Sequence, residues 1–74
     1  MVLADIESGK YITVVRFEGE PGLGNKLRQL GLAPGDRAQV IRQAPFGGPV
    51  LVDVAGRRIA LGLRVAARII VEVS

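Results

Sequence analysis

The stretch from Asn25 to Pro49 constrains the fold most strongly, because residues that end helices and form turns follow one another closely in it. Leu27 and Leu30 lie three residues apart, so they share one face of a short helix. Asn25 is the expected N-cap of this helix, since its side-chain oxygen can accept a hydrogen bond from a free backbone N–H group. Gly31 is expected to end the helix, because helices often terminate at a left-handed residue, a conformation that glycine adopts easily.

A tight turn and a stiff loop flank the strand that is expected to follow this helix. Pro34 and Gly35 fit the two central positions of a type II turn, after which a strand begins near Arg37. The loop from Ala44 to Pro49 holds two prolines around Phe46 and two glycines, so its ends are stiff and its centre can adopt unusual backbone angles. Phe46 therefore either fills the core or is displayed to a partner.

Five short segments have the β-branched and aromatic residues, or the alternating hydrophobicity, that are typical of strands. They comprise residues 10–18, 37–43, 50–54, 57–61 and 69–73. Residues 19–24 are expected to form a loop, Ala55-Gly56 a hairpin turn, and residues 63–68 a helical turn. Because a closed sheet has no edges for so small a core to protect, this pattern indicates a mainly β fold, a small antiparallel barrel in which residues 1–74 form one domain.

Strand phase predicts which side chains point inward. Val50, Val52 and Val54 alternate along one segment and are expected to face the core, whereas Leu51 faces outward. Ile41 is out of phase with the inward positions of its own strand and is also expected on the outer wall. Outward apolar side chains of this kind predict an exposed patch that marks a partner site or self-association.

Missing residue types exclude several kinds of chemistry. The chain has no cysteine and no histidine, which excludes disulfides, the usual zinc sites, cysteine nucleophiles and histidine bases. Asp36 and Asp53 resemble turn and strand-surface residues, and Glu7, Glu18 and Glu20 lack a recognisable ligand spacing. We therefore expect no enzymatic activity, no cofactor and no bound metal.

Hydropathy and charge limit the location and the partners. Hydrophobic residues make up 49% of the chain, but no run approaches the ~20 that a membrane helix needs, and the N-terminus does not resemble a signal peptide. We expect a soluble protein that stays inside the cell. Residues 21–74 hold eight basic and three acidic residues, a balance that suits RNA, acidic lipid or an acidic protein face. RNA binding is the alternative, although three aromatic residues offer few stacking platforms.

Four motifs occur in a characteristic order. They are Leu-Arg-Gln-Leu-Gly-Leu-Ala-Pro-Gly at 27–35, Ala-Pro-Phe-Gly-Gly-Pro at 44–49, Val-Ala-Gly-Arg-Arg-Ile-Ala-Leu at 54–61 and Ala-Ala-Arg-Ile-Ile-Val-Glu at 66–72. Together they resemble the ferrous iron transport protein A (FeoA) family. The resemblance implies an SH3-like β-barrel and a cytoplasmic accessory protein of ferrous iron uptake, whose partner is the membrane permease FeoB with its GTPase domain. It implies no enzymatic activity.

The resemblance also points to residues that face a partner. Leu32 matches the second leucine of the Leu-Gly-Leu motif and is expected at a partner-facing rim. The complete set of expected partner-binding residues is Leu32, Ile41, Pro45, Phe46, Pro49 and Leu51. We expect the permease to recruit the protein to the inner face of the membrane. We expect no nucleic acid to bind, and weak self-association through the same exposed patch is a further possibility that the sequence leaves open. An excised C-terminal module of a metal-dependent repressor is a third reading, since that module resembles the same domain.

Overall fold

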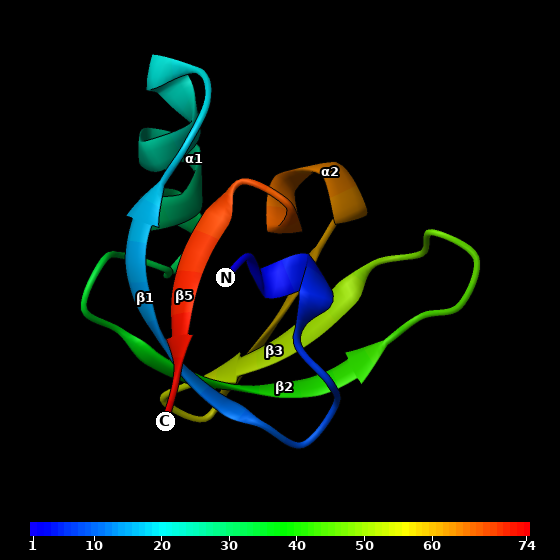
Figure 1. Cartoon of the computed structure of the whole chain (residues 1–74). Helices are drawn as coiled ribbons and strands as arrows, with labels where there is room; N and C mark the ends of the chain where they lie inside the picture. Colours follow the sequence, from blue (N-terminus) through cyan, green and yellow to red (C-terminus); the bar gives the residue numbers. More distant parts are fainter.

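Five antiparallel strands form one curved sheet in the order β4-β3-β2-β1-β5 (Figure 1), in a computed structural model that describes residues 1–74. Along the chain the elements are a 3₁₀ turn η1 (Leu3–Asp5), β1 (Tyr11–Phe17), α1 (Pro21–Leu30), β2 (Arg37–Gln43), β3 (Val50–Val54), β4 (Arg57–Leu61), α2 (Leu63–Ala66) and β5 (Ile69–Val73). The predicted mainly β fold of five strands and one or two short helices is therefore confirmed.

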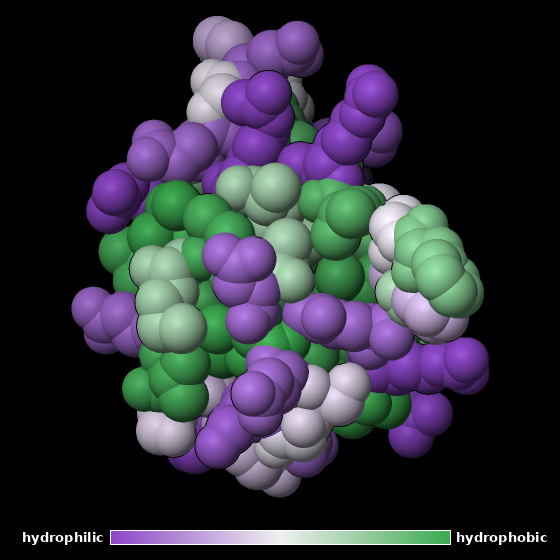
Figure 2. All heavy atoms as spheres, turned by 45° about the vertical axis from the view of Figure 1, so that its right-hand side comes forward, coloured by the Kyte–Doolittle hydropathy of each residue, from purple (hydrophilic) through white to green (hydrophobic).

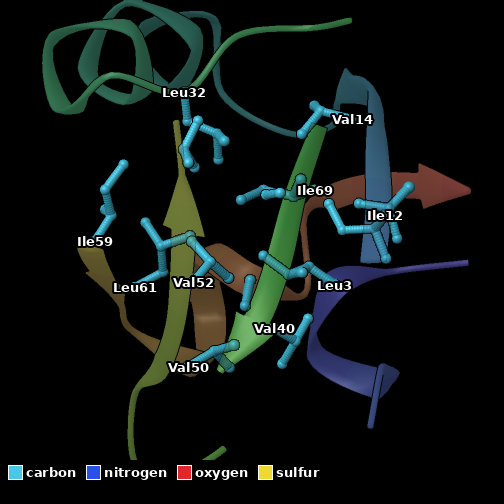
Figure 3. Packing of buried hydrophobic residues seen from close by; sticks show 14 of the residues in the cluster. Leu3, Ile12, Val14, Leu32, Val40, Val50, Val52, Ile59, Leu61 and Ile69 are labelled. Carbon is cyan, nitrogen blue, oxygen red and sulfur yellow. The ribbon is translucent and has the colours of Figure 1, made fainter. Parts of the chain in front are cut away.

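The core is built from alternating strand residues. All 16 buried residues are hydrophobic, and no polar side chain is buried with them. Val50, Val52 and Val54 are buried as their alternation predicts. Figure 3 shows that Val40 lies among the other side chains of this cluster, whereas Ile59 on β4 lies at its margin.

The two predicted tight turns are present. Ala55 and Gly56 have φ values of 52° and 83°, and two positive φ angles are the mark of a type I′ hairpin turn, whose twist matches that of the strands. In the Pro34-Gly35 turn, the N–H of Asp36 donates to the carbonyl of Ala33 at 3.0 Å. The Asp36 carboxylate adds a second hydrogen bond across the turn, which it accepts from the N–H of Ala33 at 2.8 Å.

Both helices differ from their predicted bounds. Helix α1 begins at Pro21, so the expectation of a loop over 19–24 and of Asn25 as N-cap is wrong. Proline fits the first turn because its missing N–H would have no helical partner there and its φ is already helical. The predicted stop is confirmed, since Gly31 is left-handed with φ 99°. Helix α2 ends two residues before its predicted bound, at Ala66.

An N-terminal segment that the sequence did not predict completes the core. Leu3 and Ile6 are both buried. The Gln43 amide nitrogen fastens this segment to β2 by donating to the carbonyl of Ala4 at 2.9 Å and to that of Ile6. The segment also lies along one edge of the sheet, because the N–H of Val71 donates to the carbonyl of Met1 at 2.8 Å.

Closure of the barrel is incomplete. β4 and β5 end the strand order and are not paired with each other, so the expectation that closure removes the sheet edges is not met. The N-terminal segment covers part of the β5 edge, where Val2 forms an isolated bridge with Ile70. β4 pairs with β3 alone.

Two glycines of α1 are expected to respond in opposite ways to alanine. Gly24 lies inside the helix, and a Cβ there would make ordinary contact with Phe17 at 3.6 Å, so Gly24→Ala should raise the free energy of unfolding by about 1 kcal/mol. Gly31→Ala should lower it by about 1–2 kcal/mol, because its φ of +99° is strained for alanine and the added Cβ would collide with the Arg57 guanidinium. Urea unfolding of both variants measures these changes. Equal effects of the two substitutions would contradict the assigned helix bounds.

Candidate functional site

The loop between β2 and β3 holds a bulky aromatic side chain in an unfavourable backbone conformation. The N–H of Ala44 donates to the carbonyl of Pro49 at 3.0 Å, and that of Gly48 to the carbonyl of Pro45 at 3.3 Å, so the loop is compact. Phe46 has φ 59°, and its side chain is fully exposed. A non-glycine residue in this region costs about 1–3 kcal/mol, and such strain clusters at functional sites. Phe46 is therefore displayed and does not fill the core.

An exposed leucine extends the apolar surface of this loop. A Cβ added at Gly47 would lie 3.8 Å from the Leu63 side chain, which places Leu63 against the loop tip. Leu63 begins α2 and is 41% exposed. We call this surface the loop patch, defined by Pro45, Phe46, Pro49 and Leu63. The loop projects from the right of the barrel in Figure 1, and the space-filling view of that side in Figure 2 shows apolar side chains beside strongly polar ones.

The two outer-wall candidates lie where strand phase predicts. A register irregularity between Val40 and Arg42 places Ile41 in a bulge, and Leu51 pairs with Ala60 on the adjacent strand. Ile41 and Leu51 are both half-buried. They therefore supply less exposed apolar area than the loop patch does.

Leu32 does not lie at the surface, so its expected place at an exposed rim is wrong. Its side chain is 1% exposed and belongs to the core cluster. The reason is the way in which α1 ends. The N–H of Leu32 donates to the carbonyl of Leu27 at 2.9 Å, across the left-handed Gly31. This is the bond of a Schellman motif, which typically brings the residue after the glycine back against the last turn of the helix.

A second concave surface lies between α1 and α2, and it was not predicted from the sequence. Leu23, Val65 and Ile70 are half-buried residues that line it. Charged residues of both signs also line this α1–α2 groove, namely Glu18, Glu20, Lys26, Arg64 and Arg68. The wrong predicted start of α1 explains the omission, because a helix that begins at Pro21 includes Leu23 and places it one turn before Leu27.

Charged side chains are mostly unpaired. The one ion pair joins Arg16 and Glu18 at 3.6 Å, and both side chains are more than half exposed. Of the aromatic rings, Tyr11 lies under the Arg37 guanidinium at 5.2 Å from the ring centroid. No group of three or more acidic side chains lies close enough together to hold a metal ion.

Comparisons with known proteins agree with this architecture. The FeoA domain model matches residues 1–73. A protein of Methanocaldococcus jannaschii assigned as Fe(2+) transport protein A is 31% identical over 70 residues, which cover 95% of this chain and 83% of that protein. The crystal structure of an iron uptake regulatory protein (FeoA) has a TM-score of 0.91 and 32% identity, covering 100% of this chain and 97% of the other.

Two further structures bear on the fold. FeoA of Stenotrophomonas maltophilia, described as an SH3 domain protein, has a TM-score of 0.79 and 26% identity, covering 97% of this chain and 89% of that one, which confirms the SH3-like barrel. A manganese-dependent transcriptional repressor has a TM-score of 0.92 at 24% identity, but this chain covers 36% of it, so that likeness concerns the fold alone. The family model and the M. jannaschii relative together show that the chain belongs to the FeoA domain family.

Proposed function

We propose that this protein is an accessory factor of ferrous iron uptake that acts by binding the ferrous iron permease FeoB. Membership of the FeoA domain family supports the role in iron transport. The S. maltophilia relative has itself been proposed as a ferrous iron transport activating factor. A barrel without cysteine or histidine has few groups for bond-breaking chemistry, which favours a binding role.

The observation that carries this proposal is the display of Phe46. The Phe46 side chain buries none of its surface within the chain, and its backbone is held in a strained conformation. An aromatic side chain displayed in this way is suited to insertion into a partner. Leu63, which lies against the loop at Gly47, and the exposed prolines Pro45 and Pro49 add further apolar surface to the same loop. Ile41 and Leu51 are kept as partner-binding residues at the margin of the contact.

We place the protein in the cytoplasm, at the inner face of the membrane where the permease recruits it. Helix α1, the longest helix of the chain with 10 residues, is too short to span a bilayer. On this proposal, attachment to the membrane comes from the permease.

Co-purification with the ferrous permease, with and without guanine nucleotide, tests the proposal. We expect the tagged protein to retain the permease from detergent-solubilised membranes, and a change in yield with nucleotide would indicate contact with the GTPase domain. The Leu30→Asp variant is a suitable control, because Leu30 is an exposed apolar residue on α1 outside the loop patch. No permease above background in either nucleotide state would contradict the proposal.

RNA binding is the competing function, and a salt titration separates the two. A barrel that neutralises several phosphates would bind RNA tightly at low salt and lose affinity steeply as salt rises. We expect no RNA binding above background, because Arg37 already occupies one face of Tyr11 and Phe46 is the one fully exposed ring. Tight, salt-sensitive binding of RNA would favour the competing function.

A further inference from the structure

The outer edge of β4 carries backbone groups that the rest of the chain leaves unpaired. In a hairpin with a two-residue turn, the pair next to the turn exchanges hydrogen bonds, and so does every second pair after it. These pairs are Val54–Arg57, Val52–Ile59 and Val50–Leu61. The N–H and C=O groups of Arg58 and Ala60 therefore point away from β3. No backbone hydrogen bond outside the regular elements involves either residue.

This edge differs from the other edge of the sheet. On β5, the N–H of Val71 is satisfied by the carbonyl of Met1 at 2.8 Å. Along β4 no backbone group of another segment bonds to Arg58 or Ala60, and the Arg57 side chain at the start of the strand donates to the carbonyl of Gly31 at 3.3 Å. Ile59 is 7% exposed, the highest value among the core residues. Ile59 also lies at the margin of the core in Figure 3. The open seam of the barrel, defined here as the β4 edge from Arg58 to Ala60, thus has unpaired backbone groups and a slightly exposed core residue, Ile59.

The charge at this edge selects the kind of strand that can pair with it. Arg58 is exposed, and its cross-strand partner on β3 is Asp53. The Asp53 carboxylate accepts a hydrogen bond from the N–H of Gly56 at 3.1 Å and lies outside ion-pair distance of Arg58, so the guanidinium is not paired within the chain. A second copy would bring another Arg58, on a chain of net charge +3, against the same edge, so like charges oppose self-pairing. An acidic side chain on an added strand would instead meet Arg58 on the outer wall.

We propose that the β4 edge accepts an extended segment of a protein partner, in which acidic residues alternate with apolar ones, as a sixth strand of the sheet. The acidic face of the segment pairs with Arg58, and the apolar face covers Ile59 at the open seam. One end of the segment then lies near the loop patch, because Leu63 follows β4 by two residues. The inference rests on the proposed function in one respect, that the partner is a protein.

NMR titration of the ¹⁵N-labelled full chain with the peptide Glu-Val-Glu-Val-Glu tests this inference. We expect the amide signals of Arg58 and Ala60 to shift and to become protected from exchange. Lys-Val-Lys-Val-Lys, which has the same strand propensity and the opposite charge, should bind at least about tenfold more weakly because it meets Arg58 with like charge. Equal affinity of the two peptides, or shifts at the loop patch in place of β4, would overturn the inference.

Paired variants separate backbone pairing from charge. Ala60→Pro removes the outward N–H but leaves the bonds to β3, so it should weaken the acidic peptide about tenfold, whereas Ala60→Val keeps the N–H and should bind as the wild type does. Arg58→Glu should weaken the peptide about five- to tenfold, and Lys10→Glu, an equal charge change on an exposed loop residue, should not. Wild-type affinity in both Ala60→Pro and Arg58→Glu would contradict the inference. If the acidic peptide does not bind and the variants change no affinity while the permease still co-purifies, this inference alone fails. If the peptide binds at β4 but the protein does not capture the permease, the proposed function fails.

Discussion

Replacing Leu32 by aspartate is expected to unfold the domain. The side chain is 1% exposed and lies in a core without polar groups, so a carboxylate there would be buried with no partner. That cost is several kcal/mol, and a 74-residue domain has a total stability of about 4–11 kcal/mol. Leu32→Ala should lower the free energy of unfolding by about 2–5 kcal/mol through the cavity that it leaves. Circular dichroism during thermal and urea unfolding measures both effects.

Leu30→Asp is the matched control for this prediction. Leu30 lies two residues from Leu32 at the same end of α1, yet it is 44% exposed. The same change of side chain should therefore alter the free energy of unfolding by less than about 1 kcal/mol. A native melting transition for Leu32→Asp, or equal losses in the two variants, would show that Leu32 is not a core residue.

The strands could be predicted from the sequence because each has a local signal. Val50, Val52 and Val54 alternate with outward residues, and Ala55-Gly56 is a recognisable two-residue turn, so the β3–β4 hairpin needs no information from the rest of the chain. The placement of Ile41 and Leu51 on the outer wall followed from the same phase. Alternation predicts that a side chain points outward but not how much of it the neighbouring residues cover. Ile41 and Leu51 are both half-buried, which the sequence alone could not show.

The errors arose where the structure depends on contacts that are distant in sequence or on the geometry of a helix end. Leu32 follows a helix-ending glycine, and a Schellman motif returns the residue after that glycine to the core, so Gly31 is itself a local signal that Leu32 is buried. The N-terminal segment has no strand or helix period. Its place depends on Leu3, Ile6 and the long-range bonds from Gln43, which are formed only in the folded chain.

The candidate site was predictable in part. The two prolines that flank it identified the loop. The sequence left open whether Phe46 fills the core or is displayed, because an irregular loop has no periodicity that predicts the direction of a side chain. The structure supplies the exposure of Phe46 and the neighbouring Leu63. Neither the α1–α2 groove nor the open β4 edge has a local signature, since each depends on how elements far apart in sequence are arranged.

Phe46→Asp is expected to weaken permease capture strongly without weakening the fold. The aromatic side chain has no burial to lose, and aspartate tolerates positive φ better than a bulky residue does, so the melting temperature should stay the same or rise slightly. If Phe46 is the central anchor of the contact, its loss costs about 2 kcal/mol or more of binding, which is roughly a thirtyfold weaker complex. Quantitative co-purification at several permease concentrations measures this change.

The combination of the two measurements makes the prediction decisive. Leu30→Asp introduces the same carboxylate at another exposed apolar residue and should leave capture at the wild-type level, so a general charge effect would be visible in both variants. Phe46→Leu keeps an apolar side chain and should retain part of the capture. Wild-type capture by Phe46→Asp would show that the partner surface lies elsewhere. A large fall in its melting temperature would instead show that the ring supports the fold, which its full exposure and positive φ argue against.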